Sequence, residues 1–98
     1  MPLFAPLNPP LRDWRGQNVW VIGASTGIGR ATAAALHQAG ARVSVSARKA
    51  AALADFVQQH PGSQALPLDA GEPNALQQAT QQLLAQGPLD HVLYCAGH

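Results

Sequence analysis

Three glycines, Gly23, Gly27 and Gly29, are the residues whose spacing in this 98-residue sequence most clearly indicates chemistry. A short apolar run precedes them and an alanine-rich stretch with helical spacing follows them, so the segment is typical of a strand that turns into a helix. The amide groups in the first turn of a helix have no partner within the helix, and the helix dipole is positive at that end. A glycine loop in this context predicts a binding site for a phosphate-bearing anion.

Each glycine has a separate expected task in that site. Gly23 permits the backbone angles of a tight turn, Gly27 leaves room for a pyrophosphate to approach the backbone, and Gly29 lets the helix pack against the strand. The hydroxyls of Ser25 and Thr26 add hydrogen-bond donors. The alternative is a glycine-rich turn that binds no ligand. The candidate binding residues in this segment are Gly23, Ser25, Thr26, Gly27, Ile28, Gly29 and Arg30.

Arg48 and Lys49, at the end of the next expected strand, bear on which dinucleotide the loop binds. A chain that grips the ribose 2′-hydroxyl of NAD places Asp or Glu about 20 residues after the glycines, but no acid occurs here before Asp55. The guanidinium of Arg48 suits a 2′-phosphate, and Arg30 is a second candidate for that contact. The alternative is a solvated helix start, although cations are unfavourable there without an anion. The sequence therefore favours NADP(H) over NAD as the cofactor.

Short apolar runs alternate with stretches of helical spacing along the chain. Such alternation implies parallel βαβ units with right-handed crossovers, and Pro67 indicates an edge position for the third strand. The sequence therefore predicts an α/β fold, a doubly wound parallel sheet of the Rossmann type. The expected strands are 18–22, 42–47, 64–69 and 90–95, and the expected helices are 29–38, 50–60 and 73–86. The expected buried stripes are Ile28, Thr32, Ala35, Leu36 and Ala39 in the first helix and Ala50, Leu53, Ala54 and Val57 in the second.

The chain divides into two parts of unequal character. Residues 1–16 are expected to be an irregular lead-in, because four prolines among the first ten residues prevent helix and strand ladders there. Residues 17–98 are expected to form one dinucleotide-binding βαβαβαβ unit. Its last strand, 90–95, has apolar residues and lacks the Lys, Pro or bulge that usually protects a strand edge. We therefore expect it to lie at an open edge and to self-associate or to pair with further chain.

Composition excludes several classes of function. The formal net charge is +1, from six Lys and Arg against five Asp and Glu, so no basic field exists to hold a nucleic acid. No apolar run approaches the ~18 residues of a membrane span, and the four histidines show no metal-ligand spacing. The single cysteine, Cys95, cannot form an internal disulfide, whereas small secreted domains usually need several. These features predict a cytoplasmic protein with no metal, nucleic acid or membrane partner.

The segment GASTGIG, in its strand-turn-helix context, resembles the glycine loop of the short-chain dehydrogenase/reductase family, which reads Thr-Gly-x3-Gly-Ile-Gly. The resemblance begins near residues 15–16. Asp69 resembles the family's Asp that meets the adenine amine after the third strand, and residues 90–97 resemble the segment D-x-L-V-N-N-A-G. This likeness implies the strand order 3-2-1-4, with the nucleotide across the carboxyl ends of strands one and four. It adds four candidate cofactor-binding residues, namely Asp69, Ala70, Ala96 and Gly97.

The sequence departs from the family pattern at two places, one in the first strand and one in the fourth. Ile22 stands where the family usually has Thr, and Tyr94 and Cys95 stand where it has two Asn residues. That Thr helps to tie the end of the first strand to the end of the fourth, and here both ends are less polar. Either an intact sheet or a weakened cofactor site is compatible with these changes. Cys95 is expected to be inert core, with a reactive thiol as the alternative.

The family's catalytic Ser, Tyr and Lys lie beyond the fourth strand. Tyr-x3-Lys does not occur in this sequence, and Tyr94 is its only tyrosine. The resemblance therefore implies the NADP(H)-binding part of an oxidoreductase that transfers hydride between NADP(H) and a carbonyl or alcohol substrate, truncated after the fourth strand and without catalytic residues of its own. The alternative is a non-catalytic nucleotide-binding or interaction module that ends near residue 98. An open reading frame that continues past His98 into Ser and Tyr-x3-Lys would decide for the enzyme.

Overall fold

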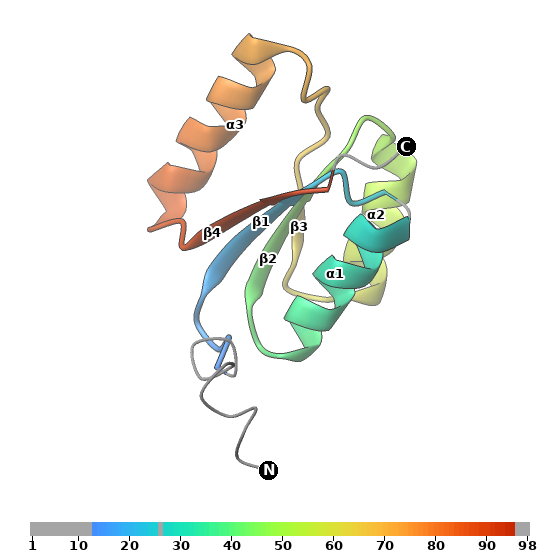
Figure 1. Cartoon of the computed structure of the whole chain (residues 1–98), viewed down its shortest axis with the longest axis vertical. Coiled ribbons are helices and arrows are strands. Elements are labelled where there is room, and N and C mark those ends of the chain that lie inside the picture. The colour runs from blue at the N-terminus through green and yellow to red at the C-terminus, as the bar shows by residue number, and fades with distance from the viewer. Residues whose placement is uncertain (1–12, 26, 96–98) are drawn as a thin grey trace, which may run out of the picture.

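The computed structural model describes residues 13–25 and 27–95, which form one parallel sheet between two layers of helices (Figure 1). The strands are β1 (Asn18–Ile22), β2 (Arg42–Ser46), β3 (Gln64–Ala65) and β4 (His91–Tyr94). The helices are α1 (Gly27–Gln38) and α2 (Ala50–Gln59), which cover one face, and α3 (Pro73–Gln86), which covers the other. The strand order is β3-β2-β1-β4. Both the predicted doubly wound Rossmann-type sheet and its 3-2-1-4 order are confirmed; residues 1–12 of the expected lead-in lie outside the described residues.

Strand β1 is buried on both faces, as its unbroken apolar sequence predicts for a central parallel strand. Val19 and Val21 pack in the cluster beneath α1 and α2, whereas Trp20 and Ile22 pack in the cluster beneath α3. The indole Nε1–H of Trp20 donates to the hydroxyl of the buried Ser46 at 2.8 Å. The polar atom of this large core side chain is therefore satisfied, and the burial of the ring carries no unpaired donor.

The buried face of α1 differs from the predicted stripe: only Leu36 of that stripe is buried, Thr32 is half-buried, and Ile28, Ala35 and Ala39 are exposed. Ile28 is 80% exposed, and the buried residues of the helix are Gly29, Ala33 and Leu36. Alanine occurs on every side of this helix, so the apolar pattern alone does not mark one face. In α2 the predicted Leu53 is buried and Val57 is half-buried, whereas the predicted Ala50 and Ala54 are exposed. The fully buried Phe56 takes their place on the inner face.

The third strand is shorter than predicted, although its edge position is confirmed. Only Gln64 and Ala65 form the strand. Beyond them, the amides of Leu66 and Leu68 donate to Val45 and Ala47 at 2.9 and 3.0 Å. Pro67 stands between these two donors, where an amide would face away from β2, so its missing N–H removes no bond to β2 and suits an edge position.

Strand β4 lies at the other edge of the sheet, as the sequence predicts. Its Val92 and Tyr94, which pair in register with Trp20 and Ile22, are 50% and 64% exposed. No strand in the described part of the chain pairs with the outer side of β4. An edge of this kind, with apolar side chains and without a protecting charge, is a template for strand pairing with another chain.

We expect this chain alone to self-associate through β4, and we expect Val92→Lys to reduce that association by placing a charge on the open edge. Light scattering across a range of protein concentrations measures the effect. Leu84→Lys is a matched control, because Leu84 is also exposed, at 53%, but belongs to α3 and not to the edge strand. Equal association of the two variants, or a monomeric wild type at high concentration, would contradict the prediction.

Candidate functional site

A groove of about 790 Å³ opens where the strands of the sheet end. It is formed by the glycine loop between β1 and α1, the turn between β2 and α2, the turn before α3, and the end of β4. In open parallel sheets, ligands bind outside the carboxyl ends of the strands. The predicted site residues that line this groove are Gly23, Ser25, Gly27, Ile28, Gly29, Arg48, Asp69 and Ala70. The predicted Thr26, Ala96 and Gly97 lie outside the described residues.

Backbone hydrogen bonds join the strand ends beneath the groove. The amide of Cys95 donates to the carbonyl of Ile22 at 2.8 Å, and the amide of Gly23 donates to the carbonyl of Ser46 at 2.7 Å. The tie between the first and fourth strands is thus a main-chain bond. Ile22 keeps its carbonyl in this bond while its side chain is buried in the core. The departure from Thr therefore leaves the register of β1 and β4 intact.

Two of the glycines are required by close approach of the backbone. A Cβ on Gly23 would overlap the carbonyl oxygen of Cys95, and the residue has a φ of +86°. A Cβ on Gly29 would overlap the carbonyl oxygen of Gly23 and lie 3.2 Å from the Cα of Ala24. Gly29 thus lets α1 pack on the turn, as expected. The close approach of the Cys95 carbonyl, just after β4, to Gly23 is not part of the sequence prediction, because it joins residues far apart in the chain.

Gly27 differs from the other two glycines because the space beside it is open. Its φ is +61°, and a Cβ there would meet no heavy atom of the described residues within 4 Å. The residue begins α1 and lines the groove, so a side chain would enter the space in front of the helix's free amide groups. Next to it, the Ile28 side chain is 80% exposed at the groove. At Gly27 the loop therefore exposes its backbone, without a side chain, to any molecule in the groove.

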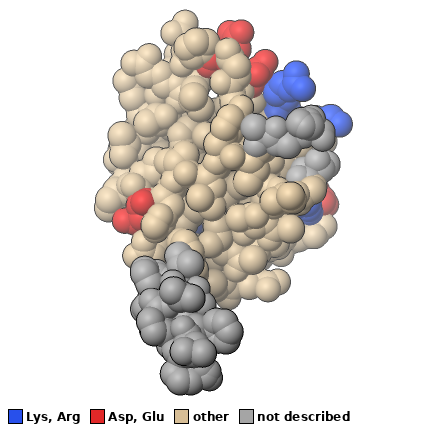
Figure 2. Space-filling model, in the orientation of Figure 1, with Lys and Arg blue, Asp and Glu red and all other residues tan. Residues whose placement is uncertain are grey.

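Arg48 and Lys49 bring positive charge to the same groove. Both side chains are exposed and line it, and Lys49 is the residue that caps the start of α2. The first turn of α2 contains no acidic residue, and Lys49 makes no side-chain cap hydrogen bond. The lining includes two cations and one carboxylate, that of Asp69. Figure 2 shows Lys and Arg atoms gathered at the end of the molecule where the strands finish, on an otherwise sparsely charged face.

Asp69 shapes the turn that leads into α3. One of its carboxylate oxygens accepts the amide of Gly71 at 2.9 Å, and its carbonyl accepts the amide of Glu72 at the same distance. The side chain is exposed at the groove, beside the half-buried Ala70. The turn before α3 thus places the Asp69 carboxylate in the lining of the groove.

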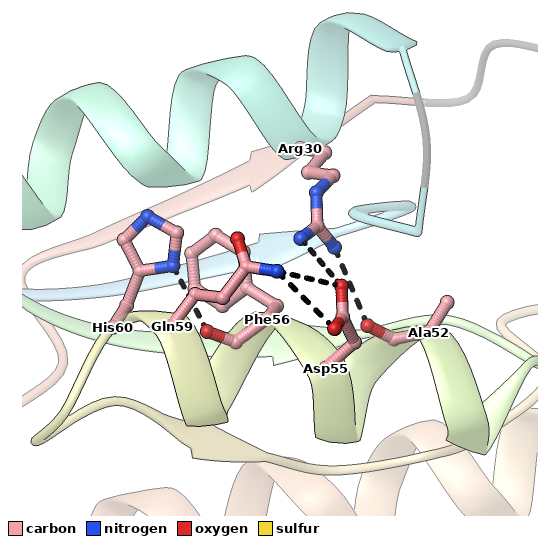
Figure 3. Close-up of polar contacts among 6 residues, drawn as sticks. All are labelled: Arg30, Ala52, Asp55, Phe56, Gln59 and His60. Atoms are coloured by element: carbon pink, nitrogen blue, oxygen red, sulfur yellow. Dashed lines mark hydrogen bonds and ion pairs between the residues drawn. The ribbon is translucent and has the colours of Figure 1, made fainter.

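Arg30 occupies a different place from the one that its position after Gly29 suggests. It is not among the groove-lining residues, and its Nη2 lies 3.0 Å from the carboxylate of Asp55 on α2. Figure 3 shows its guanidinium directed at α2. The geometry therefore favours Arg48, with Lys49 beside it, over Arg30 as the cation that meets a ligand in the groove.

The structure offers few other sites among the residues that it describes. A second hollow of about 500 Å³ lies at the amino ends of the strands, where Gln64 and Gln86 hydrogen-bond to each other at 2.8 Å. Within residues 13–25 and 27–95, no group of three or more His, Cys, Asp or Glu side chains could hold a metal ion. No helix in this range is long and apolar enough to cross a membrane.

A family model and a curated relative both match most of this chain. Residues 17–98 match the family model described as short chain dehydrogenase. D-erythrulose reductase of Gallus gallus is 42% identical over 81 residues, which cover 83% of this chain and 32% of the reductase. The chain therefore spans about a third of the length of that relative.

Solved structures give the same picture of the fold. The structure described as ribose-5-phosphate isomerase from Brucella melitensis 16M aligns with a TM-score of 0.82 at 34% identity, over 88% of this chain and 34% of that chain. The RhlG/NADP active-site complex from Pseudomonas aeruginosa aligns with a TM-score of 0.80 at 33% identity, over 91% of this chain and 38% of that chain.

Proposed function

Because this chain belongs to the short-chain dehydrogenase family, we propose that its groove binds NADP(H) and that the chain is the cofactor-binding part of a cytoplasmic oxidoreductase. One observation carries the proposal. The glycine loop and the Arg48–Lys49 pair, about 20 residues apart in sequence, line one groove at the carboxyl ends of the strands. NADP(H) needs both features in one site: a backbone surface for the pyrophosphate and a cation for the 2′-phosphate.

The residues of the groove fit such a cofactor by shape and by donor chemistry. The open space beside Gly27 admits a pyrophosphate to the first-turn amides of α1. Ser25 adds a hydroxyl to the lining, and Asp69 adds the carboxylate to which the resemblance gives the adenine amine as partner. When bound, the nicotinamide of NADP(H) supplies or accepts the hydride. The residues of this chain hold and orient the cofactor.

The preference for NADP(H) over NAD rests on charge. No carboxylate lies at the end of β2 to accept a ribose 2′-hydroxyl, and Arg48 and Lys49 stand there instead. The NADP complex among the similar structures supports the same assignment. Asp55, the first acid after the loop in sequence, is engaged by Arg30. An NAD-binding role for Asp55 would have to break that ion pair.

The reaction itself is a proposal about the whole protein. The reductase relative supports hydride transfer to a carbonyl, whereas the fold alone fixes no chemistry, as the likeness to a structure described as an isomerase illustrates. Reduction of a carbonyl leaves an alkoxide that needs a proton from a positioned acid. Since Tyr-x3-Lys does not occur in residues 1–98, we propose that further chain supplies the acid and the substrate pocket. A non-catalytic nucleotide-binding module is the rival function, and the reading frame beyond His98 separates the two.

Arg48→Ala is expected to weaken NADP(H) binding by about 10- to 100-fold and to change NAD(H) binding little. The reason is that a charge-assisted contact to the 2′-phosphate is lost, and only NADP(H) carries that group. Titration of each dinucleotide, followed by fluorescence or calorimetry, measures the selectivity. Arg42→Ala is the matched control, because Arg42 is also exposed but lies at the amino end of β2. Wild-type protein that binds NAD(H) as tightly as NADP(H) would refute the assignment.

A further inference from the structure

Arg30 is held by three separate contacts from α1 to α2 (Figure 3). Its Nη2 pairs with the carboxylate of Asp55 at 3.0 Å, and its Nη1 donates to the carbonyl of Ala52 at 3.4 Å. The guanidinium carbon also lies 5.4 Å from the centre of the Phe56 ring, within the range of a cation–π contact. Only 26% of the Arg30 side chain is exposed. A guanidinium with three partners on one helix is bound in place more firmly than an isolated surface ion pair.

The partners of Arg30 are themselves fixed. Asp55 accepts the side-chain amide of Gln59 at 3.2 Å through both carboxylate oxygens. Phe56 is fully buried, and its ring stacks on that of His60 at 4.1 Å between centroids. The ring nitrogen Nδ1 of His60 is bonded in turn to the carbonyl of Phe56 at 2.9 Å. The part of α2 that receives Arg30 therefore has little freedom of its own.

This contact joins the two helices that directly follow the two parts of the proposed cofactor site. Arg30 directly follows Gly29, the last glycine of the loop, and α2 begins directly after Arg48 and Lys49. The first turn of α2 also lacks a side-chain cap or an acidic residue that would stabilise it. Contacts from α1 to Ala52 in this turn, and to Asp55 and Phe56 in the next turn, therefore affect the position of Arg48 and Lys49 relative to the loop.

We propose that Arg30 is a positioning residue, which sets the position of Arg48 and Lys49 relative to the glycine loop through its contacts with Asp55 and Phe56. This inference rests on the proposed binding of NADP(H). It assigns Arg30 a task different from direct contact with the 2′-phosphate. The two tasks differ in what they require of Asp55. If Arg30 bound the 2′-phosphate directly, neutralising Asp55 would release the guanidinium for that contact. If Arg30 acts as a positioning residue, neutralising Asp55 removes the contact on which it depends.

The direction in which NADPH affinity changes when Asp55 is neutralised distinguishes these tasks. Asp55→Asn and Arg30→Ala are both expected to weaken NADPH binding by about three- to tenfold, the scale of one ion pair together with a cation–π contact. NADH binding, which does not use the cations, should change less. Asp55→Glu keeps the carboxylate and should retain most of the NADPH affinity. Asp13→Asn is the control, since it removes an ion pair to Arg15, at 3.1 Å, that lies away from α2.

A second measurement needs no cofactor. Hydrogen exchange should accelerate in Arg30→Ala and Asp55→Asn at the amides of residues 53–56, which close the first turn of α2, and should stay unchanged in Asp13→Asn. Wild-type binding of NADPH, together with equal or tighter binding by Asp55→Asn, would overturn the positioning role. Unchanged exchange in both α2-contact variants would overturn it as well. A wild-type protein that binds neither dinucleotide would overturn the proposed function, and the role of Arg30 in it.

Discussion

Valine in place of Gly27 should reduce dinucleotide affinity by about 100-fold or more while the sheet stays folded. The open space beside Gly27 leads to the first-turn amides of α1, and a branched side chain would fill it. A pyrophosphate kept away from those amides loses several charge-assisted hydrogen bonds at once. Titration with NADPH and NADH measures the loss, which should affect both because both carry the pyrophosphate.

Strain must be separated from obstruction in this test. Gly27 has a φ of +61°, a conformation that costs roughly 1–2 kcal/mol for a residue with a side chain. Gly16 has a φ of +78° and likewise meets no described atom within 4 Å, but it lies outside the groove. Gly16→Val should therefore show a similar loss of stability with normal binding. Normal binding by Gly27→Val would mean that this loop is not the phosphate site.

Alanine in place of Gly29 is expected to lower the free energy of unfolding by about 3 kcal/mol, the upper range for a side chain forced into a packed position. The new methyl group would overlap the carbonyl oxygen of Gly23 and approach its carbonyl carbon to 2.9 Å. Neither is a flexible side chain that could move aside, so α1 must shift from the sheet. For a domain of this size, thermal unfolding should move down by roughly 12–24 °C.

Gly71→Ala provides the matched comparison for Gly29→Ala. Its Cβ would lie 3.3 Å from a side-chain oxygen of Asp69, a contact that a small rotation relieves. Thermal unfolding followed by circular dichroism compares the two variants directly. Similar melting temperatures would contradict the close packing of α1 on Gly23. Gly29→Ala and Gly27→Val should therefore differ, because we expect Gly29 to be required for folding and Gly27 for access of the ligand.

The fold was largely predictable from local patterns. The apolar run of β1 and the helical spacing of α3 each identify an element without reference to the rest of the chain. Alternation of such elements implies a parallel sheet, since parallel neighbours need a long crossover. The groove followed from the same logic, because parallel strands end at one edge and bring the glycine loop, Arg48 and Asp69 together.

Errors occurred where the sequence pattern was weak or where a distant partner was needed. The alanine-rich α1 has apolar residues on all sides, so its buried face could not be identified until Gly29 was seen against Gly23. The third strand is shorter than its apolar pattern predicts, because only Gln64 and Ala65 form the regular ladder, although Leu66 and Leu68 still donate to β2.

By itself the sequence determined the order of strands and helices and the absence of an acid at the end of β2, and it predicts a phosphate-binding loop, because each depends on residues near one another in the chain. The tertiary structure decided which face of α1 is buried, that the Cys95 carbonyl lies against Gly23, and that Arg30 pairs with Asp55. Arg30 and Asp55 are separated by 25 positions, and Gly23 and Cys95 by a still longer segment. Local preferences cannot select between a phosphate and a carboxylate as the partner of Arg30. That choice is made only when packing brings α1 and α2 together.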